Sequence, residues 1–287
     1  MANTKINWTN KSWNLISGCT KISQGCQNCY AEIMTRRLNA MGQAKYSEGF
    51  NKVIEHLECL NEPFKWKKPQ MIFVNSMSDT FHKDVSVEFI AQIYTVMFLN
   101  PQHTFQILTK RPERRKTIMS SLPFNPVMQD DLWKYCNQFH NKFINNLEQE
   151  LYFQNEIMEE FPLKNVWEGV TVESNKQYDR IKFLQDTPAK VRFLSCEPLL
   201  TELPNLPLAN IDWVIVGGES GNKARPIYKR WVIDIKEQCK KANVQFFFKQ
   251  WSSFHDFSAF SELGIDLIDW QKDTLNGIEY HNFPNTK

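Results

Sequence analysis

Three cysteines, Cys19, Cys26 and Cys29, lie within eleven residues near the start of the chain. No histidine lies in this segment, and Gly18 and Gly25 each precede one of the cysteines. Thiolates are preferred ligands of soft metal ions and of iron–sulfur clusters. Three thiolates leave one iron of a [4Fe–4S] cluster without a protein ligand, whereas structural zinc requires a fourth. The spacing predicts such a cluster with an open iron. Three buried, inert thiols are the alternative.

The elements that would position these cysteines follow a regular alternation. Helix-length segments with apolar residues at three- and four-residue spacing lie at Val87–Leu99, Asn175–Leu184 and Lys229–Ala242. Short runs rich in β-branched and aromatic residues indicate buried strands. These runs are Trp13–Ile16, Met71–Val74, Thr104–Leu108, Val166–Val172, Val191–Leu194, Trp213–Val216 and Val244–Phe248. The pattern predicts an α/β fold, a partial or full parallel (β/α) barrel. A doubly wound open sheet is the alternative.

Two segments depart from the alternation. Residues 122–163 carry early prolines and then a long polar and aromatic stretch, which predicts a helical segment inserted between the third and fourth strands. Residues 252–287 show less regular patterning and are expected to form a C-terminal appendage. The barrel itself is therefore predicted to span residues 1–251.

Composition restricts the class of protein. The net charge of +2 argues against a protein that holds nucleic acid mainly by bulk positive charge. A local basic patch with an aromatic residue, Lys65–Lys68, keeps nucleic acid open as a partner. No long apolar run or secretory signal appears, so we expect a cytoplasmic protein without membrane association. Seven cysteines, an odd number, favour free thiols over a disulfide framework.

Several longer segments resemble a family of phage and bacterial proteins of unknown function that is similar to a divergent branch of the radical S-adenosylmethionine superfamily. The resemblance extends over nearly the whole chain. Its segments are Trp13–Arg37, Phe64–His82, Pro101–Arg114, Val191–Leu200, Ile211–Pro226 and Phe246–Trp251. It implies a radical-S-adenosylmethionine-like barrel, S-adenosylmethionine as cofactor beside the [4Fe–4S] cluster, and a flavodoxin- or ferredoxin-like electron donor.

The chain departs from the commonest superfamily pattern in two places. Six residues separate Cys19 from Cys26, where that pattern has three. The second strand is followed by Asn75–Asp79 and not by the Gly-Gly-Glu that usually binds the methionine amino group. If the barrel forms, Ser76, Ser78 and Asp79 lie at the carboxyl end of that strand, where they could bind an amino group and a ribose. Helix capping is the alternative.

Residues at the ends of other strands supply the remaining candidates. Lys110 could bind a carboxylate or a phosphate. Cys196 and Glu197 bring a thiol and a carboxylate towards the active face. These three residues are the predicted catalytic residues. A solvated helix start and core packing are their structural alternatives. The predicted cofactor-binding residues beyond the second strand are Glu173, Gly217, Gly218 and Glu219.

The sequence thus favours an iron–sulfur enzyme that starts radical chemistry from S-adenosylmethionine, with a nucleic-acid base as one candidate substrate. A second hypothesis is a nucleic-acid-binding or repair-associated protein with a structural iron–sulfur or zinc site. A third is a metal-independent barrel protein whose cysteines are incidental.

Overall fold

The computed structural model describes residue 4 and residues 6–121, 161–254 and 260–284. Most of the predicted inserted segment, residues 122–160, lies outside these ranges, as does Cys136. No helix within the described ranges has the length and apolar character needed to cross a membrane.

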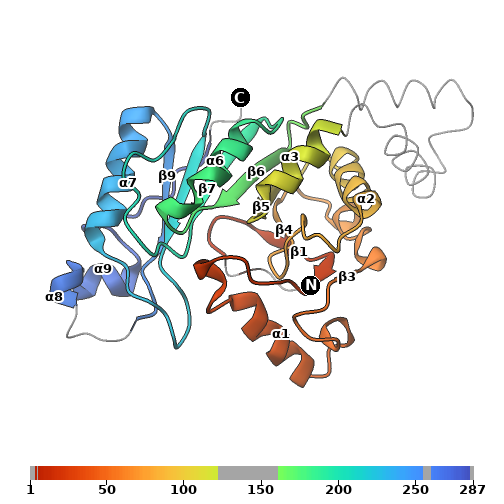
Figure 1. Cartoon of the computed structure of the whole chain (residues 1–287), viewed down its shortest axis with the longest axis horizontal. Coiled ribbons are helices and arrows are strands. Elements are labelled where there is room, and N and C mark those ends of the chain that lie inside the picture. The colour runs from red at the N-terminus through yellow and green to blue at the C-terminus, as the bar shows by residue number, and fades with distance from the viewer. Residues whose placement is uncertain (1–3, 5, 122–160, 255–259, 285–287) are drawn as a thin grey trace, which may run out of the picture.

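Seven parallel strands form one curled sheet, a half-barrel, in which neighbours in space follow one another in the chain (Figure 1). This order confirms the predicted partial barrel and excludes the doubly wound alternative, in which the strand order reverses at a switch point. The strands are β1 (Lys11–Trp13), β4 (Met71–Val74), β5 (Thr104–Thr109), β6 (Val166–Thr171), β7 (Val191–Cys196), β8 (Trp213–Gly217) and β9 (Gln245–Gln250).

The first predicted strand, Trp13–Ile16, is divided in the structure. Its start belongs to β1, whereas its end forms β2 (Ile16–Ser17), which pairs antiparallel with β3 (Ile54–Glu55). Asn75 accounts for the division, because its side-chain oxygen accepts hydrogen bonds from the backbone N–H groups of Leu15 and Ile16, at 2.8 and 3.1 Å. These N–H groups therefore have a side-chain partner in place of a neighbouring strand.

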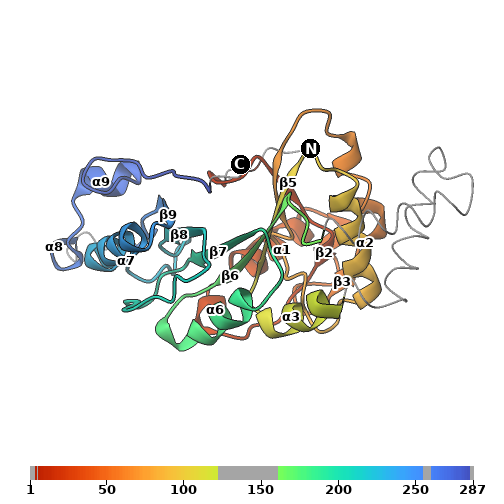
Figure 2. The same cartoon turned by 90° about the horizontal axis from the view of Figure 1, so that it is seen from above.

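Four helices lie in an arc around the outside of the curled sheet (Figure 2). Local signals set their ends: the Ser86 hydroxyl accepts a hydrogen bond from the N–H of Phe89 at the start of α2, and Asn243, with φ +56°, ends α7. The helices are α2 (Val87–Phe98), α3 (Pro112–Ser121), α6 (Tyr178–Gln185) and α7 (Lys229–Ala242).

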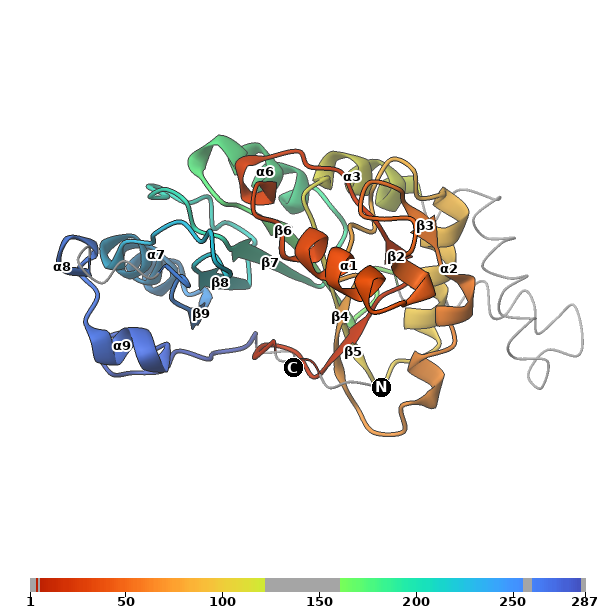
Figure 3. The same ribbon diagram turned by 90° about the horizontal axis from the view of Figure 1, so that it is seen from below.

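A fifth helix, α1 (Tyr30–Ala40), begins directly after Cys29 and lies apart from the arc, in front of the sheet when the molecule is seen from below (Figure 3). The shorter helical segments are η1 (Gln24–Cys26), η2 (Ala44–Tyr46), η3 (Leu57–Cys59), η4 (Pro63–Lys65), η5 (Asn175–Gln177), α8 (Phe260–Leu263) and α9 (Leu267–Lys272).

Aromatic side chains fill the concave side of the half-barrel. Trp213 contacts both Trp167 and Phe247 edge-to-face, with ring centroids 5.8 Å apart in each pair. Gly169 makes room for Phe193, since a Cβ there would lie 2.3 Å from its ring. The aliphatic residues of the opposite strand face pack under the helices. The large number of Phe and Trp residues therefore serves packing here.

The segment after α9 returns along β9. The N–H of Phe248 donates to the carbonyl of Tyr280 at 2.8 Å, and Phe247 forms an antiparallel bridge with His281. The indole N–H of Trp213 donates to the carbonyl of Asn282 at 2.8 Å. The predicted C-terminal appendage thus covers the β9 edge and adds to the interior of the half-barrel.

Candidate metal centre

Residues Gly18–Cys29, here called the cysteine loop, lie beside the carboxyl ends of the strands, here called the mouth. Two backbone features fix the start of the loop. Gly18 has φ +83°, and a Cβ there would lie 1.9 Å from the carbonyl oxygen of Lys52, so only glycine fits. The N–H of Cys19 donates to the carbonyl of Phe50 at 2.7 Å. The loop ends at Cys29, the N-cap of α1.

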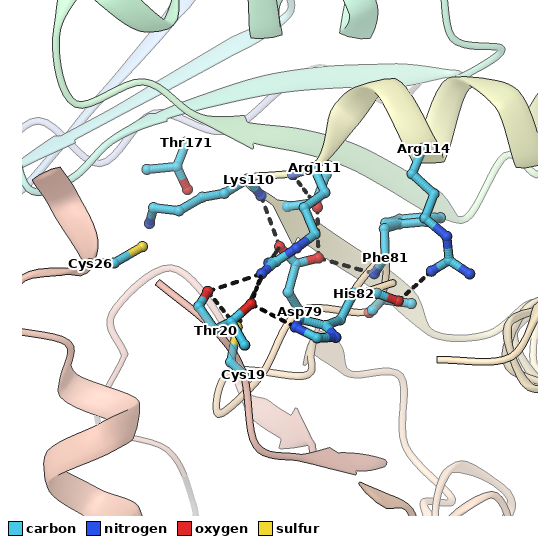
Figure 4. A network of polar contacts seen from close by, with 12 residues as sticks. Cys19, Thr20, Cys26, Asp79, Phe81, His82, Lys110, Arg111, Arg114 and Thr171 are labelled. Carbon is cyan, nitrogen blue, oxygen red and sulfur yellow. Dashed lines mark hydrogen bonds and ion pairs between the residues drawn. The ribbon is translucent and has the colours of Figure 1, made fainter. Parts of the chain in front are cut away.

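The first anchor of the loop comes from the residues after β4 and β5. The Asp79 carboxylate forms an ion pair with Arg111 at 2.8 Å and also accepts hydrogen bonds from the Thr109 hydroxyl and the Lys110 N–H (Figure 4). Arg111 in turn donates to the carbonyl and the hydroxyl of Thr20, at 2.9 and 3.0 Å, and lies 3.7 Å from the Cys19 sulfur. Asp79 therefore orients an arginine that holds the first cysteine.

The second anchor is Glu173, two residues after β6. One carboxylate oxygen accepts two hydrogen bonds from the loop. The donors are the Ser23 hydroxyl and the Gly25 N–H, and the Gly25 nitrogen lies 3.3 Å from that oxygen. The other oxygen pairs with Arg180 of α6 at 2.8 Å. Because the Glu173 side chain is fully buried, its position between Arg180 and the loop is fixed.

The third anchor is Glu219, two residues after β8. Its carboxylate accepts hydrogen bonds from Asn28 of the loop at 3.0 Å and from Arg225, whose Nε lies 2.8 Å away. Arg225 also donates to the carbonyl of Gln24 at 3.1 Å. Burial acts to raise the pKa of Glu219, but the hydrogen bonds from Arg225 and Asn28 outweigh it and hold that pKa below its ordinary value.

The three anchors share one design. Each is a buried carboxylate near the end of an alternate strand, and each pairs with an arginine that sequence reasoning did not select for this role. Spacing carries part of the signal, because Arg180 and Arg225 follow Glu173 and Glu219 by seven and six residues. Arg111 is 32 residues from Asp79, so only the parallel neighbouring strands bring them together. The cysteine loop is thereby fixed at its start, middle and end.

Comparison with known families gives one match, which extends over nearly the whole chain. A family model described as "Protein of unknown function (DUF5131)" matches residues 3–284. The chain belongs to the DUF5131 family. No curated protein and no solved structure matches it.

The six thiols that the structure of this DUF5131 protein describes fall into two groups. Cys59, Cys196 and Cys239 are buried, whereas the three cysteines of the loop are half-buried. Burial raises the pKa of Cys19 to about 11, and Asp79 adds to this against the opposing charge of Arg111. For Cys26 burial also acts upward, but the charge of Lys110 and hydrogen bonds within the loop bring its pKa below the ordinary value. A lower pKa favours the thiolate, the form that ligates metals.

Among the residues that the structure describes, no group of three or more His, Cys, Asp and Glu side chains is arranged to hold a metal ion. The donors of the loop are thiols alone, and all three come from one anchored segment at the mouth. Thiols without a neighbouring histidine are the donors that iron–sulfur clusters use.

The other predicted cofactor-binding residues of the DUF5131 protein differ in their surroundings. Ser76 donates its hydroxyl hydrogen bond to the Asn14 side chain at 3.0 Å, whereas the buried Ser78 hydroxyl oxygen has no partner among the described residues. A Cβ at Gly218 would lie 2.3 Å from the backbone nitrogen of Ser252, so this glycine permits close packing of the chain on itself. Gly217 adjoins Glu197, 3.4 Å from the position of a Cβ.

The structure separates the three predicted catalytic residues. Cys196 is fully buried in the layer between the sheet and the helices, and it lies on the same strand face as Leu194. Burial raises the pKa of its thiol far above the ordinary value. Glu197, directly after β7, forms an ion pair with Lys249 of β9, and β8 lies between these two strands. Only Lys110 extends towards the cysteine loop (Figure 4).

The aromatic residue of the basic segment Lys65–Lys68, which the sequence offered as a contact for nucleic acid, is used inside the protein. Trp66, in the basic segment Lys65–Lys68, is buried in the core beside His103, with ring centroids 6.0 Å apart. Trp251 is buried as well, and its indole N–H donates to the carbonyl of Thr274 at 2.9 Å. These positions remove one sequence argument for nucleic acid as a partner.

Proposed function

We propose that this DUF5131 protein is an iron–sulfur enzyme of radical S-adenosylmethionine type, with Cys19, Cys26 and Cys29 as the protein ligands of a [4Fe–4S] cluster. The observation that carries the proposal is the convergence of three carboxylate–arginine pairs on the loop that bears these thiols. Burying a carboxylate costs free energy, and three buried carboxylates paired with arginines are used to hold this one loop. Inert cysteines would require no such anchoring.

The position of the loop also supports the proposal. In sheets of parallel strands, reactive groups gather at the carboxyl ends, where loops from several strands converge. When bound, a reduced cluster would supply the electron for the cleavage of S-adenosylmethionine. The chain's own residues would do the rest: Arg111 would donate to the Cys19 sulfur, Glu173 and Glu219 would hold the loop in position, and the aromatic interior would close the opposite end of the half-barrel to water.

Anaerobic reconstitution with iron and sulfide tests the proposal directly. We expect the protein to take up iron and acid-labile sulfide in equal amounts and to give, after reduction with dithionite, a paramagnetic signal that changes when S-adenosylmethionine is added. Cys26→Ala and Cys29→Ala should abolish iron uptake. Cys239→Ala is the matched control, because it removes a buried thiol far from the loop and should leave the iron content unchanged.

Each contrary result points to one alternative. A cluster signal that does not respond to S-adenosylmethionine would replace the radical enzyme with a protein that has a structural cluster. Binding of zinc, or of no metal, would overturn the cluster itself. Iron uptake that survives both loop substitutions would show that other residues hold it.

A further inference from the structure

The ion pair between Glu197 and Lys249 at the mouth differs from the three anchors of the cysteine loop. In each anchor both carboxylate oxygens accept hydrogen bonds, from the paired arginine and from neighbouring residues. In this pair one oxygen of Glu197 accepts from the Lys249 ammonium group, and the other has no hydrogen bond within the residues that the structure describes. The two side chains are 19% and 18% exposed. The pair therefore holds no part of the loop and retains a free acceptor beside free N–H donors.

A glycine lets the two partners meet across β8. A Cβ at Gly217 would lie 3.4 Å from the carboxyl carbon of Glu197 and 3.5 Å from the Cβ of Lys249. A longer side chain at this position would stand between the two partners. Two residues further along the chain, Glu219 accepts a hydrogen bond from Asn28 of the cysteine loop. A ligand bound at the pair would therefore lie beside the anchored loop.

Two buried hydroxyl groups adjoin the pair on the concave side of the sheet. Ser195 shares a face of β7 with Phe193, in the aromatic interior, because Leu194 between them packs under the helices. Thr171 is the register partner of Ser195 on β6. Ser195 and Thr171 are 3% and 2% exposed, and neither hydroxyl has a hydrogen-bond partner in the described part of the chain. Buried hydroxyl groups are ordinarily hydrogen-bonded, so these two indicate a position that a polar ligand fills.

The charges around this position select the kind of ligand. A carboxylate only accepts hydrogen bonds, an ammonium group only donates them, and a hydroxyl does both. Glu197 would repel an anion and Lys249 would repel a cation. The group that fits is therefore neutral and carries a donor beside an acceptor.

The edge of a nucleobase has this pattern, and enzymes that act on bases recognise them by hydrogen bonds to that edge. We infer that Ser195, Glu197 and Lys249 bind the hydrogen-bonding edge of a nucleobase. Resting on the proposed function, this inference names the class of substrate that enters the same mouth.

Isothermal titration calorimetry of the full, reconstituted protein tests the inference. The probes are adenosine, cytidine, guanosine and uridine, each measured up to its solubility limit, with ribose and acetamide as comparison compounds. At least one nucleoside should bind, and it should bind more tightly than ribose, which lacks the base, and acetamide, which has a donor and an acceptor but no ring.

Two variants locate the binding. Ser195→Ala should weaken it about threefold to tenfold, the range for one neutral hydrogen bond. Glu197→Gln combined with Lys249→Met should weaken it about tenfold to a hundredfold, the range for hydrogen bonds to charged groups. The matched control is Glu202→Gln combined with Lys240→Met, which makes the same change of charge at exposed residues and should bind as the parent does. Thermal unfolding shows whether each variant remains folded.

The possible failures are distinguishable by their pattern. If none of the four nucleosides binds the parent while its cluster signal responds to S-adenosylmethionine, the inference is overturned alone. Nucleoside binding that both folded variants retain unchanged would also overturn it, as would equal binding of ribose or acetamide. If a nucleoside binds through these residues but no cluster forms, the proposed function fails alone. If neither is observed, both fail.

Discussion

Two buried carboxylates of the same chain segment, Glu168 and Glu173, hold different parts of the molecule together. Glu168, within β6, accepts a hydrogen bond from Tyr94 of α2 and lies 3.4 Å from Arg115 of α3. Glu173, just beyond the strand, pairs with Arg180 and holds the cysteine loop. Both carboxylates are almost fully buried. One fastens two helices to the sheet, and the other fastens a loop to the mouth.

The two arginines that pair with these carboxylates differ in their access to water. Arg115 is fully buried, and its Nε and Nη2 atoms have no acceptor among the described residues. Arg180 keeps 12% of its side chain exposed and also donates to the carbonyl of Thr171 at 2.8 Å. Removing the Glu168 carboxylate should destabilise the whole fold, because the buried Arg115 cannot regain hydration. Removing the Glu173 carboxylate should mainly disturb the cysteine loop, because Arg180 can regain hydration.

The largest expected effect is that of Glu168→Ala. The substitution leaves the Arg115 charge buried without its partner, so we expect the free energy of unfolding to fall by about 3–5 kcal/mol. Urea denaturation followed by circular dichroism measures this change. Replacing both charged residues, as Glu168→Met with Arg115→Met, should restore most of the loss. A decrease below about 1 kcal/mol for the single variant would contradict the comparison.

A smaller and more local effect is expected for Glu173→Ala. Removing this carboxylate frees Ser23 and Gly25, so the loop should open more often, and alkylation of Cys26 in the metal-free, reduced protein should become about tenfold faster. Mass spectrometry of timed samples measures the rate. Glu202→Ala, at an exposed carboxylate, is the control and should leave the rate unchanged. Equal rates in Glu173→Ala and the parent would show that Glu173 does not hold the loop.

The smallest expected effect is on the pH dependence of the free energy of unfolding. Glu168 in the sheet and Glu219 at the mouth should contribute to it with opposite sign. Burial raises the pKa of Glu168, so the folded state binds that proton more tightly than the unfolded state, and its contribution to stability falls as pH rises above the ordinary glutamate value. Glu219 at the mouth has a lowered pKa. Its contribution is present above the ordinary value and is lost as pH falls towards the lowered one.

Unfolding of Glu168→Gln and Glu219→Gln between about pH 8 and pH 3 measures these contributions. On acidification the parent should lose stability relative to Glu219→Gln and gain stability relative to Glu168→Gln. If the difference in unfolding free energy between parent and variant changed with pH in the same direction for both substitutions, the proposed contrast between the mouth and the layer beneath the helices would be wrong.

Much of the fold is determined by local sequence. The strand ends came within a few residues of their observed positions, and α7 has the predicted limits, because buried parallel strands and amphipathic helices repeat with different periods along the chain. Parallel pairing followed from the alternation of strands and helices. The exception was Trp13–Ile16, where the Asn75 side chain, sixty residues away in sequence, takes the hydrogen bonds of the strand.

The sequence by itself also determined which residues stand near the strand ends, since Asp79, Glu173 and Glu219 follow β4, β6 and β8 by five, two and two residues. Only the tertiary structure decided what these residues do. Their carboxylates turn inward to Arg111, Arg180 and the cysteine loop because burial of a charge requires a nearby partner of opposite charge. The same pairing engages Arg225, whereas Lys110 has no carboxylate partner among the described residues. Pairing of this kind depends on distances between strands, which no spacing along the chain contains.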